Sequence, residues 1–232
     1  MLREIVFDTE TTGLDAAHGD RLIELGCIEI VNRIPTGREF HRYLNPERQV
    51  HPDAVAVHGL TNEFLLDKPI FAEVVDEFLA FIADAPLVAH NAMFDHGFIN
   101  AELERVSRPA LPASRMVDTL ALARRRHPAG PNTLDALCKR YGIDLSQRTK
   151  HGALLDSLLL ASVYVELLGE RQATLTFGAN GTAGAERTHA GTAAQRPGPL
   201  PPLLSAEEEL AHHEFVKTLG PQPVWLEYLG DA

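Results

Sequence analysis

Long apolar runs are missing from this 232-residue sequence, and none reaches the about 18 residues that a membrane-spanning helix requires. Residues 1–8 also lack the pattern of a secretory signal, because they contain Glu4 and Asp8 and no small-residue cleavage site. The sequence therefore predicts a protein that neither enters a membrane nor is secreted. We expect a cytoplasmic location.

Cysteine and positive charge are also scarce. The two cysteines, Cys27 and Cys138, both lie in apolar stretches, which predicts two buried thiols rather than a disulfide. Acidic residues outnumber basic residues 32 to 21, for a net charge of −11. This balance argues against a stand-alone nucleic-acid binder, which usually has a basic face. It favours a domain that grips a short end of nucleic acid through bound cations and leaves duplex binding to a partner.

The first half of the sequence has the pattern of a mixed sheet. Pro35-Thr36-Gly37 is a turn signal between two strand-like segments, which predicts an antiparallel meander. A further short buried strand ends just before His90 and Asn91. We expect the strands at residues 4–10, 22–31, 38–44 and 87–89.

Apolar residues at helical spacing predict helices around these strands. We expect the helices at residues 71–82, 94–105, 132–141 and 153–168. Asn132 is the expected N-cap of the third helix, with Asp135 as its reciprocal acid and Gly142 as its terminator. Strands followed by mixed strands and helices indicate an α/β fold, a mixed central sheet flanked by helices.

The last quarter of the chain differs in composition. In residues 178–202, glycine, alanine, threonine and proline make up 18 of 25 residues, which predicts a flexible linker. Residues 203–232 contain Trp225, Phe215 and several leucines, but 30 residues are too few for an independent core. We therefore predict a folded domain over residues 1–177, a linker, and a tail that orders on a partner.

Four acidic residues lie where strand ends and helix starts are predicted. Asp8 and Glu10 are two positions apart in the first strand, so their side chains share one face. Asp95 follows a buried strand, and Asp156 lies among leucines, where a carboxylate needs a partner such as a metal. Two divalent cations held by such acids could cleave a phosphodiester. Carboxylate oxygens suit Mg²⁺ or Mn²⁺.

A base for the attacking water is also present. His151 lies five residues before Asp156, a spacing that turns about 140° in a helix, so two helical residues would not share a face. We therefore expect His151 on the loop or first turn before the helix, where Gly152 gives it freedom to move. We expect nearby carboxylates to raise the pKa of His151 and bound metals to lower it.

Each of these signals has an ordinary structural alternative. An Asp-x-Glu pair at a strand end is usually a solvated edge, and Asn91 after His90 could simply cap a helix. An acid pair in the first strand, an acid after a later strand and a histidine five residues before an acid in the last helix are much less common together, in this order, than any one of them alone.

The same residues carry a resemblance to a known family. Residues 8–13 (Asp-Thr-Glu-Thr-Thr-Gly), 90–95 (His-Asn-Ala-Met-Phe-Asp) and 151–156 (His-Gly-Ala-Leu-Leu-Asp) resemble the three motifs of the DnaQ-like (DEDD) exonuclease superfamily. Gly152 stands where the tyrosine subclass has Tyr, so the histidine subclass fits. The resemblance covers residues 4–168. Longer stretches resemble the epsilon proofreading subunits of bacterial DNA polymerase III, at residues 57–60, 63–69 and 132–141.

The resemblance implies a ribonuclease H-like fold and a 3′→5′ exonuclease that releases mispaired 3′-terminal nucleotides of DNA as mononucleotides. It implies a site of two Mg²⁺ or Mn²⁺ ions held by Asp8, Glu10, Asp95 and Asp156. His151 would act as the general base. Asp53 and His58 would face the terminal nucleotide, which Asp8, Glu10 and Asp156 also contact.

Two partners follow from the resemblance. Gln172, Leu175 and Phe177 resemble the peptide with which bacterial replication proteins bind the sliding clamp. Residues 203–232 would bind the alpha subunit of DNA polymerase III. Two other functions stay open: an RNA 3′ exonuclease of tRNA maturation or oligoribonucleotide turnover, and a non-catalytic tether between polymerase and clamp. The linker and tail disfavour the first, and the set of mutually repelling acids disfavours the second.

Overall fold

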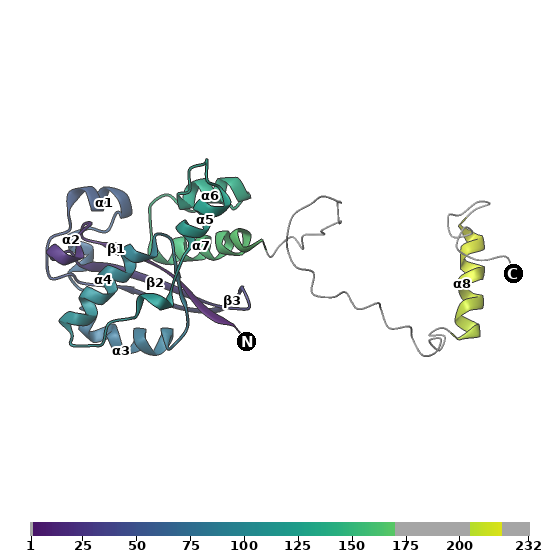
Figure 1. Cartoon of the computed structure of the whole chain (residues 1–232), viewed down its shortest axis with the longest axis horizontal. Helices are drawn as coiled ribbons and strands as arrows, with labels where there is room; N and C mark the ends of the chain where they lie inside the picture. Colours follow the sequence, from purple (N-terminus) through teal and green to yellow (C-terminus); the bar gives the residue numbers. More distant parts are fainter. Residues whose placement is uncertain (1, 170–204, 220–232) are drawn as a thin grey trace, which may run out of the picture. The chain divides into compact units, whose positions relative to one another are not determined.

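The computed structural model describes residues 2–169 and 205–219 (Figure 1). Residues 2–169 belong to one compact unit, and helix α8 (Ala206–Thr218) belongs to a second. The predicted linker and most of the predicted tail, including Trp225, lie outside the described residues. Among the described residues, no helix is long and apolar enough to cross a bilayer.

A five-stranded mixed sheet forms the centre of the first unit, in the order β3-β2-β1-β4-β5. Strands β1, β2 and β3 pair antiparallel, whereas β4 and β5 run parallel to β1. The strands are β1 (Arg3–Thr11), β2 (Leu22–Val31), β3 (Ile34–Tyr43), β4 (Leu87–Ala89) and β5 (Met116–Asp118). This architecture confirms the predicted α/β fold.

The turn of the β2–β3 hairpin lies earlier than predicted. Asn32 and Arg33 both have positive φ, 49° and 68°, and form the two-residue connection between Val31 and Ile34. Two positive φ values suit the twist of an antiparallel hairpin. The predicted turn at 35–37 lies inside β3, so that prediction was wrong. Strand β3 is an edge strand, because its outer side pairs with no other strand of residues 2–169 and 205–219, and an edge strand tolerates Pro35 and a glycine. A register shift in β2 lies opposite them.

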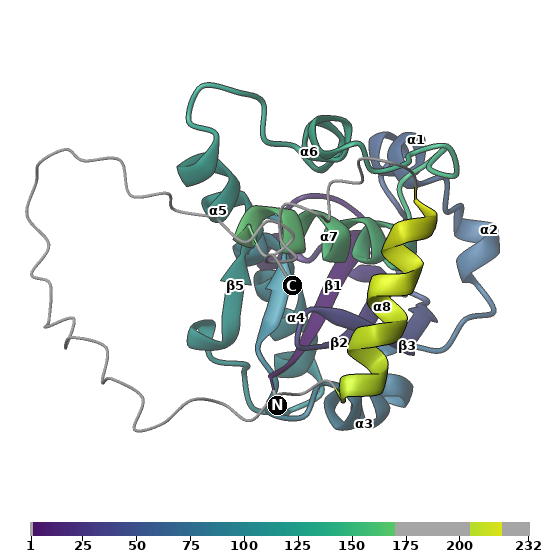
Figure 2. The same ribbon diagram turned by 90° about the vertical axis from the view of Figure 1, so that its right-hand side faces the viewer.

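Helices cover both faces of the sheet (Figure 2). Strand β1 alternates, with Ile5 and Phe7 packing on one face and Val6 on the other. The first face packs against α3 (Phe71–Ile82) and α4 (Ala92–Arg105). The second face packs against α7 (Ala153–Leu168). Buried Cys27 and Cys138 are free thiols, as predicted.

Helix α7 approaches β2 closely enough to require a glycine. A Cβ on Gly26 would lie 2.3 Å from the backbone of Ala153 and Leu154. Ser157 Oγ also donates a hydrogen bond of 3.0 Å to the Gly26 carbonyl. Because Asp8 pairs with Gly26 across β1 and β2, this contact brings the first turn of α7 over Asp8.

The predicted helices at 71–82, 94–105 and 153–168 are present, but the start of α6 (Leu134–Tyr141) differs from the prediction. Thr133, not Asn132, is the N-cap, and its side chain accepts from the Ala136 N–H. Asp135 pairs with Arg148 instead of closing a capping box. Gly142 ends the helix at φ 67°, as predicted.

Several short elements were not predicted. They include β5 and the helices α1 (Pro52–His58), α2 (Asn62–Leu65), α5 (Thr119–Arg126) and α8, as well as the 3-10 turns η1 (Ala16–His18) and η2 (Ala113–Arg115). Helices α1 and α5 both supply residues that line the cavities described below.

Candidate active site

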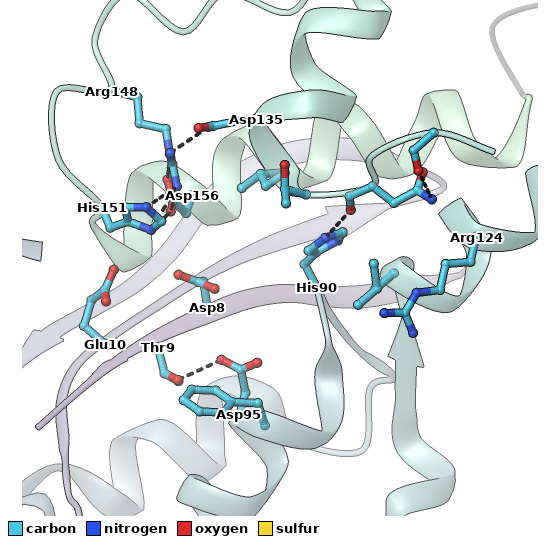
Figure 3. A pocket seen from close by; sticks show the side chains of 16 residues that line it. Asp8, Thr9, Glu10, His90, Asp95, Arg124, Asp135, Arg148, His151 and Asp156 are labelled. Carbon is cyan, nitrogen blue, oxygen red and sulfur yellow. Dashed lines mark hydrogen bonds and ion pairs between the residues drawn. The ribbon is translucent and has the colours of Figure 1, made fainter. Parts of the chain in front are cut away.

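The four predicted acids line one cavity of about 730 Å³ (Figure 3). Asp8 and Glu10 come from β1, Asp95 from the first turn of α4 and Asp156 from the first turn of α7. Asp95 and Asp156 are each only 3% exposed. The sheet and two helix N-termini therefore bring together acids that lie up to 148 positions apart in the sequence.

Local structure explains why the two helical acids are tolerated there. The N-terminal turn of a helix has unpaired N–H groups and a positive dipole end, which favour a carboxylate. Thr9 Oγ1 also donates to Asp95 Oδ1 at 2.7 Å. On the β4–α4 turn, Asn91 adopts φ 66°, and its N–H donates to Asp118 Oδ1 at 3.1 Å. Asn91 occupies the N-cap position of α4 but makes no side-chain cap hydrogen bond.

His90 serves to connect the segments around this cavity. Its Nδ1 lies 2.9 Å from Thr119 Oγ1, and its Nε2 lies 2.8 Å from the Asn132 carbonyl oxygen. The ring therefore ties the end of β4 to the starts of α5 and α6. Because both ring nitrogens have partners, His90 shapes the cavity wall.

Burial and the charges of neighbouring acids shift Asp8, Glu10 and Asp95 toward their protonated forms when no cation balances them. Burial, and then the charges of Asp95, Glu10 and Asp156, raise the pKa of Asp8 well above its ordinary value. Burial, followed by Glu24, raises the pKa of Glu10 to about 8, and burial raises that of Asp95 to about 7. Such a group of carboxylates favours the binding of positive charge.

His151 lies on the loop directly before α7, as the spacing predicted, and its side chain is 48% exposed. Nδ1 lies 3.5 Å from Asp156 Oδ2. The carboxylates of Asp156 and Asp135 act to raise its pKa, as expected, but the net shift is downward. Burial, and then the charge of Arg148, lower the pKa of His151 and outweigh the opposing effect of Asp156 and Asp135. The imidazole is therefore neutral at neutral pH, which is the form that accepts a proton.

Arg148 is a residue of this site that sequence reasoning missed. It bridges Asp156 and Asp135 and touches the ring of His151. The sequence held one indication of such a residue, because the carboxylate of Asp156 lies among leucines and needs a positively charged partner. Sequence alone could not choose among a metal, Arg148 and Lys150, because only the course of the loop decides which cation reaches the carboxylate.

Asp53 and His58 lie on α1, beside a second cavity of about 750 Å³. This cavity shares Thr9, Glu10 and Phe94 with the first, so the two adjoin along the end of β1. His58 is buried, and burial lowers its pKa. The Asp53 side chain is 94% exposed. Their contact with a nucleotide stays a prediction, and Gln172, Leu175 and Phe177 lie outside the described residues.

Comparisons with known proteins agree with the motifs. Residues 5–164 match the family described as Exonuclease. DNA polymerase III subunit epsilon of Salmonella typhimurium is 48% identical over 223 residues, covering 91% of this chain and 90% of its own. The same subunit of Escherichia coli is 45% identical over 221 residues with the same coverage, and that of Rickettsia felis is 53% identical over 174 residues, covering 74% and 76%.

Solved structures show the same fold. Exonuclease X in complex with 5′ overhanging duplex DNA superposes with a TM-score of 0.56 at 26% identity, covering 73% of this chain and 92% of its own. Exonuclease I gives a TM-score of 0.63 at 20% identity, covering 74% and 42%. With its Asp-x-Glu strand, its two later acids and its loop histidine, this chain belongs to the exonuclease family and, within it, to the epsilon subunits of DNA polymerase III.

Proposed function

We propose that this protein removes nucleotides one at a time from the 3′ end of DNA and proofreads for the replicative DNA polymerase III. The observation that carries the proposal is the meeting of four acids from three separate elements in one cavity beside His151. A structural role does not require such a group, because mutually repelling buried acids cost stability unless they bind a cation.

Exonucleases of this family depend on divalent metal ions, and the donor set in the cavity fits them. Glu10, His151 and Asp156 offer ligand atoms that all lie within 4.8 Å of one another. We propose that Asp8, Glu10, Asp95 and Asp156 hold two ions, and oxygen donors favour Mg²⁺ or Mn²⁺. When bound, such ions make water a better nucleophile at neutral pH and balance the charge that develops on the phosphoryl group.

His151 supplies the base of the proposed reaction. As a water oxygen attacks the phosphorus, its proton passes to the imidazole, and we assign Nε2, the ring nitrogen farther from Arg148 at 3.4 Å. The bond from phosphorus to the 3′ oxygen of the preceding nucleotide then breaks. That oxygen takes a proton from solvent, and a 5′-mononucleotide is released. The exposed loop position of His151 gives water access to the ring.

The second cavity is the proposed position of the terminal nucleotide. It adjoins the carboxylates at Glu10, so a nucleotide bound there would present its phosphate to the acids. His58 and Asp53 would contact this nucleotide from α1, together with Asp8, Glu10 and Asp156. The assignment of these contacts rests on the family resemblance and on the shared wall of the two cavities.

We also propose that residues 203–232 bind the alpha subunit of the polymerase, that residues 178–202 act as a tether, and that Gln172, Leu175 and Phe177 bind the sliding clamp. Helix α8, described by itself, leaves Leu210 and Phe215 exposed, as is Leu219 at its C-cap. Exposed apolar side chains of this kind commonly anchor an interface. The relatives named as polymerase III subunits support the same assignment.

Digestion of 3′-labelled substrates tests the catalytic proposal. The full chain should release mononucleotides from mispaired DNA with Mg²⁺, faster than from matched RNA, and should release none with EDTA. Asp67→Asn, at an exposed acid on neither cavity, is the matched control for Asp8→Asn. A preference for RNA would favour the RNA exonuclease. No hydrolysis of either substrate would favour the tether.

Binding to the alpha subunit tests the proposed tail separately. Leu210→Ser with Phe215→Ser should weaken the complex while leaving hydrolysis of short single-stranded DNA unchanged. Gln172→Ala with Leu175→Ala should instead weaken only binding to the clamp. Unchanged affinity of the first variant for the alpha subunit would contradict the role of α8.

A further inference from the structure

Arg148 occupies the position beside Asp156 where a cation is expected. Its Nε donates to Asp156 Oδ1 and its Nη2 to Oδ2, both at 2.6 Å, so both carboxylate oxygens are engaged (Figure 3). Nη1 donates to Asp135 Oδ1 at 2.7 Å. The side chain is only 8% exposed. A two-pronged, buried contact of this kind is the strongest form of an arginine–carboxylate pair.

The same guanidinium also contacts the proposed base. Nη2 lies 3.0 Å from His151 Nδ1 and 3.4 Å from Nε2. One side chain therefore fixes both ends of the segment from His151 to Asp156. These two residues must take up a defined separation for a metal and a base to cooperate.

Of the two arginines that line the cavity, Arg148 alone forms an ion pair within the described residues. Arg124 lies on the opposite wall and contacts no carboxylate there. The positive charge of Arg148 reaches the other acids too, since it opposes the rise in the pKa of Glu10. A divalent ion bound to Asp156 would lie against the guanidinium, and the two positive charges would repel.

We propose that Arg148 is a positioning residue that balances Asp156 and holds His151 while the site is free of metal, and that metal binding displaces its guanidinium from Asp156. The inference rests on the proposed metal site. Asp135, which is half exposed and lies outside the four-acid group, keeps the displaced guanidinium nearby. The charge of Asp156 is then balanced by Arg148 when metal is absent and by the bound metal when it is present.

The proposal gives Arg148 an effect on metal affinity opposite to that of a structural residue. If Arg148 competes with the metal, its removal should tighten metal binding. Arg148→Gln should lower the Mg²⁺ dissociation constant by about tenfold, a size consistent with loss of a charged hydrogen-bonded pair. The same variant should lower the melting temperature in EDTA and enlarge the rise produced by Mg²⁺. A merely structural role would weaken metal binding instead.

Titration calorimetry with Mg²⁺ alone, on the full chain, distinguishes these outcomes. Arg124→Gln removes the same charge from the same cavity without breaking an ion pair, so it measures the general electrostatic effect. Tighter binding by Arg148→Gln than by Arg124→Gln supports the proposal. Equal tightening in both variants, or weaker binding by Arg148→Gln, overturns it.

Two further variants distinguish failure of the Arg148 proposal from failure of the proposed metal site. Arg148→Lys keeps the charge but cannot make the two-pronged contact, so it should tighten binding less than Arg148→Gln, and it serves if the glutamine variant does not fold. A lysine variant with wild-type affinity overturns the proposal. Asp156→Asn should lose binding of one ion. If wild-type protein binds no Mg²⁺, the proposed metal site itself is wrong, and Arg148 has no competitor.

Discussion

Two groups of buried or partly buried acids in this protein have opposite surroundings. Glu102 and Glu29 are buried beside arginines: Arg21 lies 2.6 Å from Glu102, and Arg3 lies 2.6 Å from Glu29. In the cavity, Asp8, Glu10 and Asp95 form no ion pair with an arginine or lysine of the described residues. The first group is neutralised by the fold itself. The second would be neutralised by the cations that we propose for this cavity.

The pKa values follow the same division. The pKa of Glu29 lies below its ordinary value of 4.5 because Arg3, Thr36 and Arg38 outweigh the effect of burial. The pKa of Glu10 rises from the same value to about 8. Burial alone therefore does not identify a functional acid. Asp8, Glu10 and Asp95 differ from Glu29 and Glu102 because no arginine of the described residues pairs with them, and Asp156 is intermediate, because it is buried in the same cavity but pairs with Arg148.

The largest expected effect follows from removing a cavity acid. Asp8→Asn should reduce hydrolysis by at least about 10³-fold, comparable with the loss of a key group that stabilises transition-state charge. The same change relieves repulsion in the metal-free site, so the melting temperature in EDTA should stay level or rise. Rates on 3′-labelled DNA at saturating Mg²⁺, with calorimetry of the metal-free protein, check both effects. Wild-type turnover in this variant would remove Asp8 from the mechanism.

His151 should have the next largest effect. His151→Ala should lower the rate by roughly 10²–10⁴-fold, the usual contribution of a general base. In wild type, the rate should fall as pH drops through the lowered pKa of the imidazole, because protonation removes the base. The pH–rate profile and Mg²⁺ titration of the variant check this prediction. If the variant loses metal along with activity, His151 is a ligand rather than the base.

Removing an acid of the arginine-paired group should lower stability and leave activity unchanged, the reverse of the effect expected for Asp8. Glu102, 1% exposed, receives hydrogen bonds from Arg21 and Arg105. Glu102→Ala should cost about 3 kcal/mol of unfolding free energy, because it leaves Arg21 without its buried partner. The folded variant should keep its turnover at saturating Mg²⁺. Urea unfolding measures the stability of the variant, and DNA digestion measures its activity. A loss of activity without a loss of stability would show that the two groups of acids do not differ in role.

Much of the candidate site could be predicted because its signals are local. Period-two spacing places Asp8 and Glu10 on one face of a strand, and a five-residue spacing places His151 before the helix of Asp156. Amphipathic helices such as α3 bury a continuous apolar stripe, so their pattern determines their limits. The motifs then identified the family, which the comparisons confirm.

What could not be predicted depends on contacts between distant segments. Strand β5 has three residues, too few for a periodic signal, and exists because it pairs with β4. The hairpin turn is formed by Asn32 and Arg33, and Pro35 lies inside β3, because an edge strand can contain a proline. Arg148 belongs to an irregular loop, and only the folded chain brings it to Asp156. Threonine and asparagine are both common N-cap residues, so the sequence did not decide between Asn132 and Thr133. In the structure Thr133 is the N-cap, and the carbonyl oxygen of Asn132 lies within hydrogen-bond distance of His90 Nε2.

The smallest expected effect is a pH dependence that the two groups of acids impose in opposite directions. For Glu10 and Asp95, the folded protein holds protons that the unfolded chain has released above pH 4.5 and 3.8. Metal-free stability should therefore fall as pH rises from about 4.5 to about 8. Glu29 acts in reverse: its contribution is present above pH 4.5 and is lost as pH falls below that value.

Melting temperatures in EDTA should thus pass through a maximum near the ordinary carboxylate pKa and decline by several degrees toward pH 8. Saturating Mg²⁺ should remove most of the decline, because bound cations stabilise the ionised acids. Asp8→Asn should flatten the alkaline side alone, since it removes one source of repulsion from the cavity. Arg38→Gln, beside Glu29, should flatten the acid side alone. If both variants changed the same side, the two groups of acids would not be energetically separate.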